Sequence, residues 1–473
     1  IMKINELRHF IAAAMVLLLV AGCNNRRQPA TVDNKVAEEA MDSVAVVEEC
    51  KIDSVRGDSI VAKLWDEGCE VWDFSDGVAV VMGKKCGLID RSGNFVIPLK
   101  YDNIQPPTDG VAGVCLDGKW GYVDMRDSVV VAIKYDAVDY FSEGIGAVKQ
   151  GEKWGFVGKG DREVVPPIYD AAEHFAEGMA AVKLGGKYGY VDKSGRLAIP
   201  TVYDEISIFI DGLARVRSGS KWGYIDKSGH AIVPIEYDRI GFFNQGLAAT
   251  HRNGKWGYVD TTGREVVAPK YDRANAFDGG YALVGLNGKI GFIDRSGTEV
   301  VPVIYDGSRR GFSEGLAAVS IAGKWGAVDT LGRLVIPLKY EFLGDFYQGM
   351  ARACMKGKWG YIGKDNRAVV SLIYDEIEGF SEGLAATKSN NGKWGFVDRD
   401  GNVVIPFKYG WVGRFAWGVA AATYNGKTGA IDRHDNVVIP FAYRSAEGFQ
   451  AKGKFLVYDD RWQAIYLDVE PRE

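Results

Sequence analysis

Eleven copies of one short unit recur down this chain, and this repetition limits its fold more than any other feature. Each copy begins with Lys, has Gly two residues later and has Tyr sixteen residues after the Lys. Neighbouring copies are 34 residues apart, except for two steps of 35. A fixed period of this size is typical of repeat arrays, in which each unit buries its apolar face only against its neighbours. The anchoring lysines are Lys85, Lys119, Lys153, Lys187, Lys221, Lys255, Lys289, Lys324, Lys358, Lys393 and Lys427.

The two longer steps show which half of the unit accepts insertions. The Lys-to-Tyr distance never changes, so both extra residues fall between a Tyr and the next Lys. One lies within Asp306–Gly311 and the other near Lys388–Gly392. Loops tolerate insertions whereas packed elements do not. We therefore expect a rigid Lys-to-Tyr half and a half with variable loops, which would be the better recognition surface.

The residues of one unit favour short β-strands. In the copy that begins at Lys221, Trp222–Ile225 is aromatic and β-branched, which is typical of a strand. We expect a second strand at Ala231–Tyr237 and a third, shorter strand at Leu247–Thr250. Pro234 cannot donate a hydrogen bond to a ladder, so the second strand should be an edge strand or a bulged one.

Other positions of the same copy carry signals for the backbone. Gly223, inside the first strand, predicts a bulge or a close approach of another backbone segment. Asp226 followed three residues later by Gly229 is typical of a type I turn. In eight of the eleven copies, the Tyr that comes sixteen residues after the Lys is followed directly by Asp. We interpret this Asp as a turn cap that closes the second strand, with a ligand-binding role as the alternative.

These patterns predict an all-β fold. We expect an open array, superhelical or solenoid-like, of about eleven 34-residue repeats, each a β-hairpin or a three-stranded unit. The alternative is one or two β-propellers, although blades usually take about 40–45 residues and rings usually hold about four to eight blades. The array would occupy residues 63–473, with capping units at Trp65–Trp72 and Phe455–Asp468.

The N-terminal segment resembles the signal of a bacterial lipoprotein. Lys3 and Arg8 precede an apolar run, Phe10–Val20, that is too short to span a bilayer. The run ends in Val-Ala-Gly-Cys, which resembles a lipobox, with Cys23 as its cysteine. The resemblance implies that residues 1–22 are a signal peptide and that Cys23 carries the lipid.

The residues after Cys23 bear on localisation. Residues 23–62 are polar and acidic, and we interpret them as the lipidated cysteine and a flexible tether. By resemblance to lipoprotein sorting signals, Asn24 in place of Asp favours the outer membrane. We expect an outer-membrane lipoprotein that faces the periplasm, with the cell surface as the alternative.

Two stretches carry a resemblance to a known family. Phe380–Gly395 and Lys393–Tyr409, with their Lys-Trp-Gly, Phe-Ser-Glu-Gly and Ile-Pro elements, are similar to the WG-containing repeat family. The resemblance extends over about Phe74 to Phe449. It implies binding or scaffolding, and it does not imply a particular ligand.

The periodic tryptophans are the candidate ligand-binding residues. If the row is exposed, it forms a groove in which sugars stack, and the chain binds carbohydrate or peptidoglycan. If the row is buried, it is a structural ladder, and the chain is a non-catalytic scaffold for another envelope protein. We favour this second hypothesis. The row consists of Trp120, Trp154, Trp222, Trp256, Trp325, Trp359 and Trp394.

Composition and motifs argue against other classes of function. The formal net charge is −5 without a basic block, so we expect no nucleic-acid partner. The sequence has no Cys-x-x-Cys pair and no His-Glu-x-x-His motif, so we expect no metal. We also expect no cofactor, no catalytic residue and no enzymatic activity. The expected partner is another envelope protein or cell-wall glycan, and the expected contact with the membrane is the lipid anchor.

Overall fold

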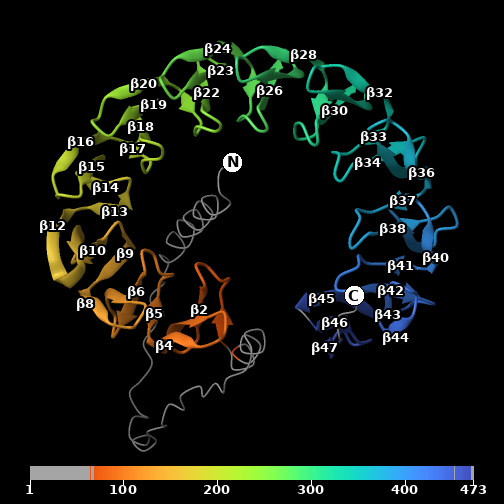
Figure 1. Cartoon of the computed structure of the whole chain (residues 1–473), viewed down its shortest axis with the longest axis horizontal. Coiled ribbons are helices and arrows are strands. Elements are labelled where there is room, and N and C mark those ends of the chain that lie inside the picture. The colour runs from red at the N-terminus through yellow and green to blue at the C-terminus, as the bar shows by residue number, and fades with distance from the viewer. Residues whose placement is uncertain (1–63, 65–68, 452, 470–473) are drawn as a thin grey trace, which may run out of the picture. The chain divides into compact units, whose positions relative to one another are not determined.

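The computed structural model describes Leu64 and residues 69–451 and 453–469. The chain divides into two units, residues 1–56 and 57–473. The first unit lies outside the described residues, and so do the predicted signal peptide, Cys23, the tether and Trp65. In the described part of the second unit, antiparallel sheets follow one another in chain order (Figure 1).

The repeat forms a four-stranded antiparallel sheet. In one such sheet β17 (Glu205–Ile206), β18 (Leu213–Ser218), β19 (Lys221–Asp226) and β20 (Ala231–Tyr237) lie side by side in that order. Eleven sheets of this kind and a final three-stranded sheet make up the described residues. The predicted all-β open array is confirmed, and the described sheets form neither a closed barrel nor a closed propeller. The twelve sheets span 70–101, 103–135, 137–169, 171–203, 205–237, 239–271, 273–305, 307–340, 342–374, 376–409, 411–443 and 445–468.

The sheets differ from the predicted units in phase. The strand expected at Leu247–Thr250 exists as β22 (Leu247–Arg252), but it pairs with the lysine strand that follows it, β23 (Lys255–Asp260). A short strand that the sequence did not predict, β21 (Arg239–Ile240), and a long one, β24 (Glu265–Tyr271), complete this sheet. The tight turn between β22 and β23 causes this shift in phase. It pairs two strands that the prediction assigned to different units, because each predicted unit began at its lysine.

The Gly and Pro signals correspond to a close contact between two strands. A Cβ on Gly223 would lie 2.5 Å from the carbonyl oxygen of Val233, so only glycine fits. The pairing of β19 with β20 is irregular between Trp222 and Tyr224. Pro234 lies on β20, which is the edge strand of its sheet. The predicted close approach and edge strand are both confirmed.

A sheet inside the array is buried on both faces by its two neighbours. Val284 packs into a core shared with Tyr258 of the preceding sheet, whereas the adjacent residue Leu283 packs into a core shared with Val319 of the following sheet. Successive side chains of a strand point to opposite faces. This alternation explains why the strands are apolar on both faces and why one sheet depends on its neighbours.

Polar contacts also join neighbouring sheets. Asp204 accepts a hydrogen bond from Lys187 Nζ at 2.5 Å and one from the amide of Gly219, in the next sheet, at 2.7 Å. The Asp after the Tyr therefore does more than cap its own strand. Glu177, in a turn of the sheet at 171–203, accepts the amide of Gly212 of the next sheet at 2.9 Å.

Three consecutive sheets carry the site described below. A 3-10 turn at Lys159–Asp161 lies elsewhere in the chain. The strands of these sheets are β33 (Phe342–Leu343), β34 (Met350–Met355), β35 (Lys358–Gly363), β36 (Ala368–Tyr374), β37 (Glu376–Ile377), β38 (Leu384–Lys388), β39 (Trp394–Asp398), β40 (Val403–Tyr409), β41 (Trp411–Val412), β42 (Val419–Tyr424), β43 (Lys427–Asp432) and β44 (Val437–Tyr443).

Candidate functional site

The tryptophan row lies between the core and the surface. Trp394 is buried, with 7% of its surface exposed, and the other six members of the row are half-buried. Trp222 lies opposite Tyr237 in the ladder between β19 and β20. All seven rings pack against or within the hydrophobic cores that join neighbouring sheets. The row therefore contributes to packing along the array.

Two segments match the Gly-x-Ser-x-Gly pattern of esterase nucleophiles, which the sequence reasoning wrongly took to be absent. In such enzymes the serine sits on a sharp strand-to-helix turn. Here Ser313 and Ser381 lie in loops between strands, and their hydroxyls donate to the carbonyls of Phe346 and Phe415 in the next sheets, at 2.6 and 2.7 Å. These serines therefore link sheets.

Arginine replaces a small or aliphatic residue at one strand position in only two of the four-stranded sheets. This position is the third residue of the strand that precedes the lysine strand, and Arg215 and Arg352 occupy it. The sequence reasoning missed both, although aligning the repeats would have found them. The other sheets have Val80, Gly113, Ala147, Ala181, Ala249, Leu283, Ala318, Ala386 and Ala421 there.

Arg352 is held in place by aromatic rings and a carbonyl. Its guanidinium carbon lies 4.9 Å from the ring centre of Trp359 and 5.2 Å from that of Phe342. Its Nη1 donates to the carbonyl oxygen of Ile377, in the next sheet, at 3.2 Å. A cation over an aromatic face is stabilised by the ring quadrupole. These contacts fix the guanidinium at the junction of two sheets.

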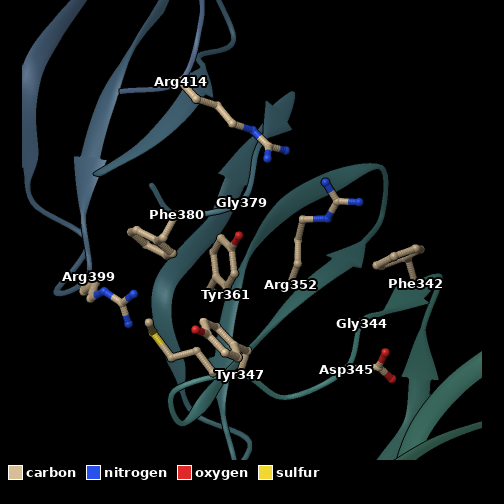
Figure 2. A pocket seen from close by; sticks show the side chains of 11 residues that line it. Phe342, Gly344, Asp345, Tyr347, Arg352, Tyr361, Gly379, Phe380, Arg399 and Arg414 are labelled. Atoms are coloured by element: carbon tan, nitrogen blue, oxygen red, sulfur yellow. The ribbon is translucent and has the colours of Figure 1, made fainter. Parts of the chain in front are cut away.

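A pocket of about 360 Å³ opens beside Arg352 (Figure 2). Figure 2 shows the ring of Tyr361 between Phe380 and Arg352, with Arg414 reaching in from another sheet. We call it the arginine pocket. Its lining residues are Phe342, Gly344, Asp345, Tyr347, Met350, Arg352, Tyr361, Gly379, Phe380, Arg399 and Arg414.

Gly379 keeps the pocket open. A Cβ at this position would meet only Nη2 of Arg414, at 3.9 Å, so the space beside the glycine is large. At the corresponding position near Arg215 the chain has Phe242, whose ring centre lies 4.1 Å from the guanidinium carbon of Arg215. The phenyl ring covers one arginine, whereas the glycine leaves the other accessible.

Three guanidinium groups dominate the electrostatics of the pocket. Burial raises the pKa of Tyr361, and the positive charges of Arg352, Arg414 and Arg399 each oppose this rise, because they favour the tyrosinate. All three charges therefore act on the same small volume. Arg414 forms an ion pair with Glu378 at 3.2 Å. Among the described residues, neither Arg352 nor Arg399 has a carboxylate partner.

One carboxylate also lines the pocket. Oδ1 of Asp345 is buried and has no hydrogen-bond partner in the described part of the chain. A buried acceptor without a donor costs free energy, on the order of 1–3 kcal/mol. The pocket therefore offers several positively charged hydrogen-bond donors and one acceptor. This combination suits a ligand that carries both an anionic group and an N–H or O–H. No group of three His, Cys, Asp or Glu side chains among the described residues could hold a metal ion.

Comparison with known proteins identifies the repeat. The WG containing repeat family matches eleven consecutive segments, at residues 87–120, 120–154, 154–188, 188–222, 222–256, 256–289, 290–325, 325–359, 359–394, 394–427 and 429–460. The chain belongs to this family. The expected number of WG repeats is confirmed, and the Trp-Gly pair that gives the family its name is the pair whose glycine touches the next strand and whose tryptophan packs on the core. The arginine pocket is made by other positions of the WG repeat.

Solved structures show only distant similarity to this WG repeat chain. A computationally designed protein, Ika8, is 14% identical, covers 56% of this chain and 93% of its own, and has a TM-score of 0.25. The extracellular domain of a hybrid two-component system of B. thetaiotaomicron is 10% identical over 84% of this chain and 70% of its own (TM-score 0.23). PorZ, a surface component of the type-IX secretion system of Porphyromonas gingivalis, is 10% identical over 85% and 82% (TM-score 0.22). TM-scores this low support no argument about arrangement or function.

No relative was found among curated proteins. In the described residues, no helix has the length and apolar character needed to cross a membrane.

Proposed function

We propose that this chain is a non-catalytic scaffold of the bacterial envelope that binds another protein through its WG repeats. The observation that carries the proposal is the arginine pocket, where Arg352 and Arg414 lie beside aromatic rings in a concave surface. Tyr and Arg are enriched among the residues that contribute most to protein–protein binding. The half-buried tryptophan row supports a protein partner over a glycan, because sugar stacking needs an accessible ring face.

The envelope location rests on the N-terminal sequence. A lipid on Cys23 would anchor the array to the outer membrane, facing the periplasm, through the acidic segment that follows. Growth with an alkyne-tagged fatty acid should label the wild-type protein and leave Cys23→Ala unlabelled. Equal labelling of both proteins would contradict the lipid anchor. Digestion of intact cells with a protease would distinguish the surface from the periplasm.

Site-specific photo-cross-linking in cells tests the scaffold. A photoreactive amino acid replaces Tyr347, which lines the pocket and is 72% exposed, in the full-length protein. The matched control replaces Ile373, which is 54% exposed on β36, at the opposite edge of the same sheet. We expect one dominant protein adduct from position 347 and a much weaker one from position 373. Equal adducts at both positions, or sedimentation of the bait with purified cell-wall glycan and no protein adduct, would contradict the proposal.

A further inference from the structure

We propose that the arginine pocket binds a carboxylate side chain of an acidic peptide segment. This inference rests on the proposed protein-binding function and specifies the chemistry of the partner. Arg352, Arg399 and Arg414 come from three different sheets and line one pocket of about 360 Å³. Planar guanidinium groups match a carboxylate through two parallel N–H···O bonds, and clusters of arginine are a recurring means of recognising acidic peptides.

The central arginine is positioned before a ligand arrives. One nitrogen of Arg352 is bonded to Ile377, and its planar group is stacked near Trp359 and Phe342, so its rotamer is fixed. Fixing a side chain in its bound conformation reduces the entropy that binding must overcome. The remaining nitrogens are donors for a ligand.

An inserted loop supports one wall of the pocket. Arg309 lies in Asp306–Gly311, the loop that the repeat spacing marked as an insertion. Its guanidinium carbon is 4.1 Å from the ring centre of Phe342, and its Nε donates to the carbonyl oxygen of Leu343 at 3.3 Å. The ring of Phe342 therefore lies near two guanidinium groups, those of Arg309 and Arg352. The insertion thus acts on recognition by holding this ring.

Asp345 favours a peptide over a simple anion. Its buried Oδ1 has no donor within the described residues, and a peptide can supply a backbone N–H at the same time as a side-chain carboxylate. The Asp345 carboxylate repels inorganic phosphate and a peptide carboxylate alike, so the preference for a peptide rests on the backbone N–H that it supplies. The largely exposed ring of Tyr347 adds an apolar contact for residues that flank the acidic one.

The chain contains its own control for this site. Arg215 makes the same kind of contacts as Arg352: its guanidinium carbon lies 4.7 Å from the ring centre of Trp222, and its Nη1 donates to Ile240 O at 3.2 Å. Phe242 covers it, whereas Gly379 leaves Arg352 open. A variant at each arginine therefore removes similar structural contacts, but only one removes a ligand contact.

Fluorescence anisotropy with the full-length protein tests the inference. The probe is a fluorescein-labelled peptide, Gly-Glu-Glu-Phe-Glu-Gly, and the comparison probe has Gln in place of each Glu. We expect saturable binding of the Glu peptide that weakens with added salt, because salt screens partly exposed charges. Arg352→Ala and Gly379→Phe should each weaken binding by at least about tenfold, whereas Arg215→Ala should leave it unchanged.

Several results would overturn the inference. Equal affinity for the Gln peptide would show that charge is not read, and equal losses in Arg215→Ala and Arg352→Ala would show that the effect is structural. Binding of an oligogalacturonate without binding of the Glu peptide would identify an acidic glycan instead. A photo-cross-linked protein at position 347 together with no affinity for the Glu peptide would retain the scaffold and reject this specificity.

Discussion

The sheets of Arg215 and Arg352 make the same internal contacts, but the space beside the arginine is filled in the first sheet and open in the second. In both, the arginine stands opposite a buried tyrosine, Tyr224 in one sheet and Tyr361 in the other. The two hydroxyls donate to carbonyls of the following sheet at 2.7 and 2.8 Å. In both sheets the tyrosine ring also meets a phenylalanine of the following sheet, with ring centres 4.7 and 4.9 Å apart. These contacts belong to the scaffold, because they recur in the sheet whose arginine is covered by Phe242.

The difference arises at positions that the scaffold leaves variable. Phe242 near Arg215 corresponds to Gly379 near Arg352, and Thr261 and Ala276 correspond to Arg399 and Arg414. Each exchange removes a ring or adds a charge without touching the ladder. A repeat array can therefore create a site by changing a few loop residues while each sheet keeps its fold. The predictions below test whether scaffold and site are separable in this way.

The largest expected effect should be common to both sheets. A Cβ on Gly223 or Gly360 would lie 2.5 or 2.4 Å from a carbonyl oxygen of the adjacent strand. Alanine at either position should destabilise the array by about 3 kcal/mol, because the backbone must move to relieve the overlap. Urea unfolding followed by far-UV circular dichroism measures this loss. Gly379→Ala, where the nearest atom is 3.9 Å away, should stay close to wild type. A loss confined to one of the two sheets would mean that they do not share this backbone contact.

The buried tyrosine hydroxyls should give the next largest effect. Tyr224→Phe and Tyr361→Phe each leave a carbonyl of the next sheet, that of Gly241 or Glu378, without its donor. We expect each to destabilise the array by about 1–2 kcal/mol. Tyr347→Phe, at an exposed ring, is the control and should have almost no effect on the urea midpoint. If the loss at Tyr361 were much smaller than at Tyr224, the two junctions would not be equivalent.

The elements of the scaffold could be predicted from the sequence because each depends on local chemistry. The strand at Ala231–Tyr237 is observed with the predicted bounds. The turn before it was predicted from Asp226 and Gly229, and the amide of Gly229 does bond to the carbonyl of Asp226 at 2.9 Å. Glycine at position 223 predicted a close backbone contact, which exists. All these signals act within a few residues of their cause.

The pocket could not be predicted in the same way, because its parts meet only through stacking. Gly379 and Arg414 belong to the two sheets that follow the sheet of Arg352. The sequence shows which residue departs from the repeat, but the cover over Arg352 depends on a side chain that is missing one repeat later. The tryptophan row was predicted as the candidate binding site because it is periodic. A residue that recurs in most repeats is one that the packing of each sheet requires.

The two arginines should differ modestly in their contributions to stability. Arg215 lies 4.7 and 4.1 Å from the ring centres of Trp222 and Phe242, and its Nε is buried. Cation–π contacts are stronger when they are desolvated, so Arg215→Ala should cost about 1 kcal/mol and Arg352→Ala about half of that. A double-mutant cycle with Phe242→Ala should show a coupling energy for Arg215. A larger loss of stability at Arg352 would mean that the pocket arginine is structural and that the two sheets do not differ as proposed.

The smallest expected effect is a pH dependence that only one of the two sheets should show. After β19, Asp226 Oδ1 accepts the Ser228 hydroxyl at 2.6 Å and the His230 amide at 2.9 Å, and these bonds, the Ser228 hydroxyl first, lower the pKa of Asp226 below its usual 3.8. After β35 the corresponding residue is Gly363, which has no carboxylate. Because the folded pKa lies below the unfolded one, this stabilisation is present above about pH 4 and is lost as the pH falls through the folded pKa. Hydrogen exchange between pH 5 and 2, corrected for intrinsic rates, should therefore show the turn at Asp226 opening at a higher pH than the turn at Gly363. Asp226→Asn should remove this difference. Equal opening of both turns would mean that acid acts on the whole array.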